Sequence, residues 1–103
     1  GITDFQTTGN PPEAPISIIA CNETESSIEI VITGGKNASR FMLWRRLESE
    51  TLGQAIPIAT DIRPKDRAYT DTTLVAGQRY IFHVTAHNSY GSAGPSNEVR
   101  VTP

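Results

Sequence analysis

His83 and His87 stand four residues apart and come nearest in this chain to a metal-binding motif. On a helix this spacing places both rings on one face, where they could bind one ion. The segment Gln78 to Asn88 instead alternates apolar and polar residues, which predicts a strand. Four steps of about 3.3 Å separate the rings by about 13 Å, too far for one ion with ligand bonds of about 2 Å. We therefore expect two independent, solvent-exposed histidines with ordinary pKa values and no metal site.

Other groups that could support catalysis are scattered along the chain. Serines and threonines are numerous, but none lies in a Gly-x-Ser-x-Gly elbow. Asp61, Asp66 and Asp71 come nearest to an acidic cluster, but cations interleave with them in the stretch DIRPKDR, unlike the ligands of a calcium loop. The sequence predicts no catalytic residue, no cofactor and no enzyme activity.

Trp44 is the side chain best suited to contact a partner. If Phe41 and Leu43 face the core, Trp44 points outward beside Arg46, and exposed aromatics with arginine are typical of interaction surfaces. Alternatively, Trp44 lies flat on the sheet under the stems of Arg and Lys side chains. Tyr90, in a turn, is either a second partner contact or a lid on the edge of the core.

The overall composition excludes several classes of partner. Nine basic and eleven acidic residues form no electrostatic footprint for nucleic acid and no polybasic membrane anchor. No stretch approaches the roughly 20 apolar residues of a membrane-inserted helix. Cys21 is the only cysteine, so no internal disulfide can form.

Short runs rich in β-branched residues recur between turn signals from Pro15 onward, and no window holds a helical period. Ser27 to Thr33 alternates cleanly, and Pro57 suits a strand at the edge of a sheet. Seven strands at this spacing predict an all-β, antiparallel, immunoglobulin-like sandwich of two sheets. Residues 1–12, which end in Asn-Pro-Pro, are interpreted as a linker or an added segment, and residues 13–103 as the domain.

The second half of the chain resembles a fibronectin type III domain, especially the modules of bacterial secreted proteins. The resemblance rests on Leu74, Gly77, Tyr80, Phe82, Val84, Ala86, Asn88, Gly91, Pro95, Ser96 and Pro103. It implies a structural tyrosine corner formed by Leu74, Gly77 and Tyr80, in which the tyrosine hydroxyl bonds to backbone upstream. The first half fits more loosely, and Ile32 stands where the family usually has a tryptophan.

The resemblance implies a non-catalytic spacer in a larger extracellular or cell-surface protein, with the neighbouring domains as its partners. Gly1 in place of methionine indicates either a piece of a longer chain or a residue left by removal of a tag, and we expect the isolated domain to be a monomer. The alternative is a module that binds a protein or a polysaccharide through the outer sheet face or the turn at Tyr90. Asn22 and Asn37 lie in N-glycosylation tripeptides, which would matter only in a eukaryotic secretory pathway.

Overall fold

Alternating apolar and polar residues form strands along the chain in the computed structural model, which describes residues 9–103. One short 3-10 helix, η2, interrupts them. The elements are β1 (Ile16–Cys21), β2 (Ile28–Gly34), β3 (Arg40–Leu47), η2 (Leu52–Gln54), β4 (Ile56–Ile62), β5 (Ala68–Asp71), β6 (Tyr80–Asn88), β7 (Gly91–Ala93) and β8 (Val99–Val101).

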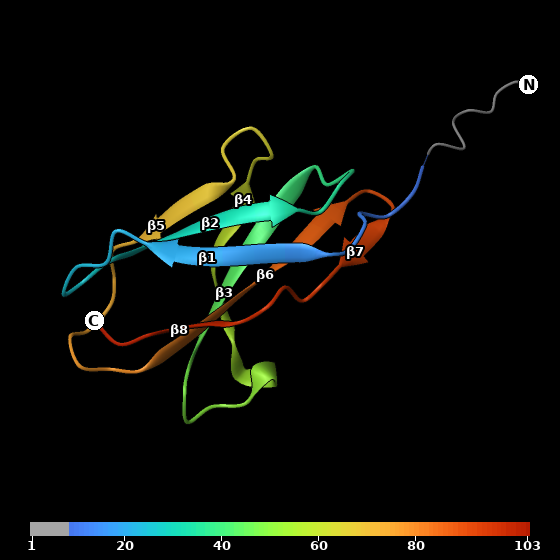
Figure 1. The fold of residues 1–103 in the computed structure, drawn as a ribbon. Helices are drawn as coiled ribbons and strands as arrows, with labels where there is room; N and C mark the ends of the chain where they lie inside the picture. Colours follow the sequence, from blue (N-terminus) through green and yellow to red (C-terminus); the bar gives the residue numbers. More distant parts are fainter. Residues whose placement is uncertain (1–8) are drawn as a thin grey trace, which may run out of the picture.

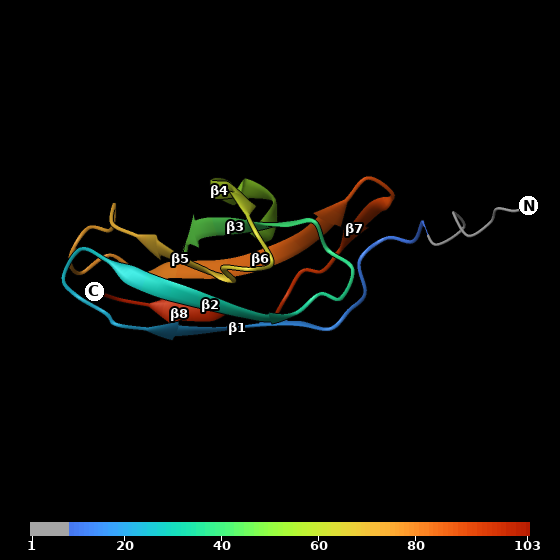
Figure 2. The same cartoon turned by 90° about the horizontal axis from the view of Figure 1, so that it is seen from above.

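The strands form two antiparallel sheets (Figure 1). One sheet has the order β1-β2-β5, and the other has the order β4-β3-β6-β7, with β8 also paired to β6. Seen from above, β1 and β2 lie in one layer, and β3 and β4 lie in the other (Figure 2). The predicted two-sheet sandwich is confirmed.

The core lies between the sheets and is built from alternate residues of β2, β3 and β6. Phe41 and Phe82, on two paired strands, are the largest fully buried side chains. Removing each large apolar side chain from water contributes about 2 to 3 kcal/mol. Ile32, which stands where the resemblance expects a tryptophan, is buried in the same cluster as Phe41. The smaller residue on β2 is therefore accompanied by a large aromatic on β3.

The described residues form eight strands instead of the expected seven, because the last strand is divided. Both β7 and β8 pair with β6, and Ser96 lies between them. The Val84 N–H donates to Ser96 Oγ at 2.8 Å, and the Ser96 N–H donates to the Val84 carbonyl at 2.9 Å. A side chain thus replaces one ladder bond where the strand bulges away from its neighbour.

Asn97 closes the seam between the two sheets at β1. Its Oδ1 accepts the Ile18 N–H at 2.7 Å, and its Nδ2 donates to the Ile18 carbonyl at 3.0 Å. One side chain therefore satisfies both backbone groups of a residue on an edge strand. This side of the sandwich offers little free edge to another chain.

The segment expected to be a linker touches the domain where it is described. Residues 1–8 lie outside the described residues. The Asn10 carbonyl accepts hydrogen bonds from the side-chain amides of Asn37 at 2.8 Å and Asn88 at 2.7 Å, and Pro12 is buried. The domain boundary at residue 13 stays a prediction. Asn10 and Pro12, which precede this boundary, contact the domain.

Candidate functional site

The outer face of the β3–β6 pair holds Trp44 and His83, which stand opposite each other in register. Their rings stack with centroids 6.0 Å apart and planes 2° from parallel. His83 is only 6% exposed, so the expectation of a solvent-exposed histidine is wrong. The alternation along β6 indicates the outward direction correctly, but the Trp44 ring comes from the neighbouring strand and covers the imidazole. The His83 Nδ1 has no hydrogen-bond partner among residues 9–103.

Burial lowers the pKa of His83 below its usual range. The charge of Glu98 acts to raise this pKa, and the charge of Arg46 acts to lower it. Desolvation is the largest of the three effects, as expected for an imidazolium that would have to lie under an indole ring. The neutral form is therefore favoured.

His87 belongs to a short chain of hydrogen bonds on the same face. The Trp44 Nε1–H donates to Thr85 Oγ1 at 2.9 Å, and this hydroxyl lies 2.7 Å from His87 Nε2. His87 is half-buried, and burial followed by the charge of Arg40 lowers its pKa. The expectations of full exposure and an ordinary pKa are therefore wrong for His87 as well.

Trp44 and Arg46 point to the outer face of β3 but are engaged within the domain. Trp44 is half-buried and contacts His83 and Thr85. One nitrogen of the Arg46 guanidinium donates to the Glu50 carbonyl, and another forms an ion pair with Glu98 at 2.9 Å. A partner would have to compete with these contacts.

Tyr90 lies in the turn after β6 and is 62% exposed. Its backbone N–H donates to Asn88 Oδ1 at 2.8 Å, which fixes the turn. The ring rests against the backbone of Gly9, since a Cβ added there would meet Tyr90 Cε1 at 2.1 Å. Tyr90 is thus part of the contact with the N-terminal segment, and its role toward a partner stays a prediction.

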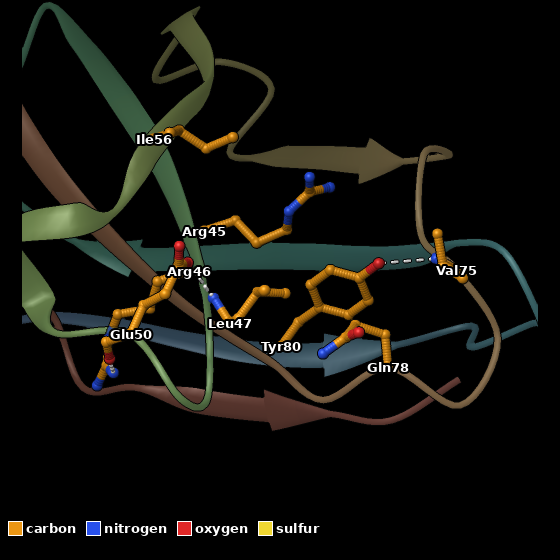
Figure 3. Close-up of a pocket in the computed structure, with 8 residues that line it drawn as sticks. All are labelled: Arg45, Arg46, Leu47, Glu50, Ile56, Val75, Gln78 and Tyr80. Carbon is orange, nitrogen blue, oxygen red and sulfur yellow. Dashed lines mark hydrogen bonds between the residues drawn. The ribbon is translucent and has the colours of Figure 1, made fainter.

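The structure brings Leu74, Gly77 and Tyr80 together at the opposite end of β6. The Tyr80 hydroxyl accepts the Val75 N–H at 2.8 Å, and the ring is 4% exposed (Figure 3). Gly77 has a φ of +84°, a backbone conformation that glycine adopts without strain. Its N–H donates to the Pro103 carbonyl at 2.6 Å. The corner ties the loop before β6 to the end of the chain.

A buried ion pair adjoins this corner. Arg45 donates to Asp71 Oδ2 at 2.8 Å, and its guanidinium lies 4.9 Å from the centre of the Tyr80 ring. Asp71 Oδ1 also accepts the N–H and the hydroxyl of Thr73, so the carboxylate is well satisfied. This pair was not among the features predicted from the sequence. The signal was available: Arg45 follows Phe41 and Leu43 at alternate, inward positions.

Two surface depressions flank the sandwich. A cavity of about 400 Å³ lies beside the corner and is lined by Arg45, Arg46, Leu47, Glu50, Ile56, Val75, Gln78 and Tyr80 (Figure 3). A second, of about 440 Å³, lies between β4 and β5 and includes Asp61 and Asp66. Asp71 is buried away from these two aspartates beside Arg45, so the three do not form one cluster. Within residues 9–103 no group of three or more His, Cys, Asp or Glu side chains could hold a metal ion.

The comparisons with known proteins address the fold. No protein-family model and no curated protein matches this chain. An Fn3-like protein from Clostridium thermocellum is 21% identical, with a TM-score of 0.68 over 91% of this chain and 93% of its own. The fn3 domain of human contactin 1 is 15% identical, with a TM-score of 0.69 over 90% of this chain and 76% of its own. This chain has the fibronectin type III fold.

A fibronectin type III fold hosts many functions, so the fold alone assigns none. The twitchin kinase region from C. elegans is 20% identical, with a TM-score of 0.72 over 90% of this chain but only 17% of that one. Modules of this fold therefore occur within much longer polypeptides. In the described part of the chain, no helix is long and apolar enough to cross a bilayer.

Proposed function

We propose that this domain is a non-catalytic spacer that holds neighbouring domains of a larger protein apart. The observation that carries the proposal is the position of the two ends of the described chain, which lie at opposite ends of the sandwich (Figure 1). A module with this geometry adds its full length to a row of domains.

The contacts at each end of β6 define the distance. Asn10, at the entry, is held by Asn88 at the end of this strand. Pro103, at the exit, is held by Gly77, shortly before the strand begins at Tyr80. Eight steps from Tyr80 to Asn88, at about 3.3 Å each, separate these points by about 26 Å. The entry is therefore held at one end of β6, and the exit is held by the loop that leads into the other end of this strand.

Small-angle X-ray scattering of one, two and three copies joined head to tail through residues 1–12 tests this proposal. We expect the maximum dimension to grow by about 26 Å or more with each copy. A matched series with a glycine-serine stretch inserted at each junction separates the spacing due to the module from stiffness of the junction. If the natural series stays nearly as compact as one copy, the module does not act as a spacer.

The exposed ring of Tyr90 favours one second candidate, a binding module for a protein or a polysaccharide that uses Tyr90 and the outer face with Trp44 and Arg46. Binding of the wild type, Trp44→Ala and Tyr90→Ala to a polysaccharide panel and to the parent protein's other domains tests it. If Trp44 or Tyr90 is a hot-spot residue, its replacement by alanine should weaken the binding free energy by about 2 kcal/mol. No binding by the wild type rejects this candidate for those ligands.

We further propose that the parent protein is extracellular or attached to the cell surface. The support is the resemblance of residues 70–103 to modules of bacterial secreted proteins. Fractionation of cells that express the full-length polypeptide tests it, and retention in the cytoplasm would reject it.

A further inference from the structure

The sandwich is closed on one side and open on the other. On the closed side, Asn97 bonds to both backbone groups of Ile18. On the open side, the edge strands β4 and β5 belong to different sheets, and no hydrogen bond joins them among the described residues. A groove of about 440 Å³ lies between them. Its lining includes Ile58, Ile62, Ala68, Tyr69, Asp61 and Asp66.

Tyr69 shows that this groove is an opening into the core. It pairs in register with Ile30, whose side chain is fully buried between the sheets, so Tyr69 occupies an inward-facing position of β5. It is nevertheless 38% exposed, and its hydroxyl makes no hydrogen bond to residues 9–103. Because the Tyr69 ring occupies an inward position and is still partly exposed to solvent, a further side chain has room to pack beside it.

The two edges differ in what they offer to another strand. On β4, Pro57 lacks an N–H, and the pairing with β3 shifts register on either side of Leu43. Both features blunt an edge against further pairing. The edge strand β5 (Ala68–Asp71) contains no proline and keeps a regular register with β2. An added strand would therefore form its backbone hydrogen bonds with the free edge of β5.

The charges at one end of the groove select the occupant. Asp66 forms no ion pair with the described residues, and Asp61 has only a long, exposed contact with Arg63 at 3.5 Å. Arg67 is turned away, because it donates to the Gly34 carbonyl and lies over the Phe41 ring. Arg63, Lys65 and Arg67 do not line the groove, whereas Asp61 and Asp66 do, so the two carboxylates favour a cation at this end.

We infer that the groove between β4 and β5 binds an extended peptide segment of a partner protein. The segment adds a strand to β5, places apolar side chains beside Tyr69 and Ile58, and sets a lysine or arginine against Asp61 and Asp66. Backbone pairing supplies affinity and the alternate side chains supply specificity, as in other cases of strand addition. This site does not depend on the spacer role.

Three synthetic probes test the inference. The first peptide alternates valine and threonine and carries lysine at one end, the second replaces that lysine with glutamate, and the third has proline in the middle. Each is titrated to roughly millimolar concentration, since strand addition by a short peptide is weak, into the 15N-labelled domain. We expect the lysine peptide to shift the amide signals of Ala68–Asp71 and Ile58–Ile62, and the proline peptide to leave them unmoved.

Two variants and one control sharpen the result. Asp66→Lys should weaken the lysine peptide about threefold and strengthen the glutamate peptide, because exposed charges are worth a few tenths to one kcal/mol. Tyr69→Ala should abolish the shifts, whereas Ile19→Ala, at an exposed position on the edge strand of the closed side, should preserve them. No shifts with the lysine peptide, equal shifts with the proline peptide, or shifts confined to β1 would each overturn the inference. So would a dimer in sedimentation velocity that Tyr69→Ala dissociates, because the occupant would then be a second copy of the chain.

Discussion

His83 shows how one neighbour decides the chemistry of a residue. Its position on β6 faces outward, where a histidine would normally be solvated and titrate near its usual pKa of about 6.5. Trp44 covers it instead, and Arg46 and Glu98 contribute charges of opposite sign. Tyr80, the first residue of the same strand, is the reverse case, since its hydroxyl accepts a hydrogen bond from a backbone N–H only five residues earlier in the sequence.

The domain should lose stability as the pH falls through the titration of His83. Its pKa is lowered in the folded state, so the unfolded chain takes up a proton first, and the free energy of unfolding falls as the unfolded state binds more protons. The stability that His83 contributes in its neutral form is fully present above its unfolded-state pKa of about 6.5. This stability is lost as the pH falls from that value through the lower pKa of His83 in the folded state. Urea unfolding between pH 8 and pH 5 should show a shallower pH dependence for His83→Gln than for the wild type. A pKa of His83 measured by NMR at or above the value of free histidine would contradict this account.

Tyr80→Phe should destabilise the domain by about 1 kcal/mol, because it leaves the Val75 N–H, which donates a part-buried hydrogen bond to the Tyr80 hydroxyl, without its acceptor. Chemical denaturation of the variant beside the wild type measures the loss. Tyr90→Phe is the matched control, since that ring is largely exposed and its hydroxyl has no partner among residues 9–103. Equal midpoints for Tyr80→Phe and the wild type would show that the hydroxyl bond contributes little.

At the scale of the elements, side chains of the segment between β7 and β8 make hydrogen bonds where the backbone pairing with β6 is interrupted. Between β7 and β8, Ser96 keeps the chain bonded to Val84 on β6, and Asn97 reaches across to Ile18 on β1. The two sheets are thereby joined by side-chain bonds at the seam where the backbone ladder is interrupted. The opposite side, between β4 and β5, has no equivalent bond among the described residues.

Asn97→Ala should open this seam. The Ile18 N–H and carbonyl would lose their partners, at a cost of about 1 kcal/mol, since water can reach part of the gap. Hydrogen exchange read by NMR should show faster exchange of the Ile18 amide, while the Val84 amide, held by Ser96, stays protected. Ser92→Ala, on exposed β7, is the control and should change neither amide. Unchanged exchange at Ile18 would mean that Asn97 does not hold the seam.

At the scale of the whole molecule, the path of the chain from one end of the sandwich to the other matters most. Asn10 is held by Asn37, in the loop between β2 and β3, and by Asn88 at the end of β6, and Pro103 is held by Gly77. Entry and exit are therefore part of the folded unit, so a neighbouring domain at either end would be attached to a point of defined position.

Truncation tests where this folded unit begins. A chain of residues 13–103 should be less stable by about 1 to 2 kcal/mol than both the full 103 residues and residues 9–103. The loss arises because the side-chain amides of Asn37 and Asn88 would no longer have the Asn10 carbonyl as their acceptor. Thermal and urea unfolding of the three chains measure it. If residues 13–103 match the full chain, the boundary at residue 13 stands and the first twelve residues contribute nothing to stability.

Features that depend on local pattern can be predicted from the amino-acid sequence. Alternation along Ser27 to Thr33 and Gln78 to Asn88 predicted strands and their inward faces, because strand pleat is set by residues close in sequence. The resemblance to fibronectin type III domains implied the corner of Leu74, Gly77 and Tyr80, whose residues are also close in sequence. The tertiary structure alone decided which outward residues are covered. Trp44 reaches His83, Arg45 reaches Asp71, and Asn97 reaches Ile18 across 39, 26 and 79 positions of sequence. Periodicity within one strand carries no information about the register of its neighbour, so burial of the outer face and the open groove at β5 emerge only when the sheets pack.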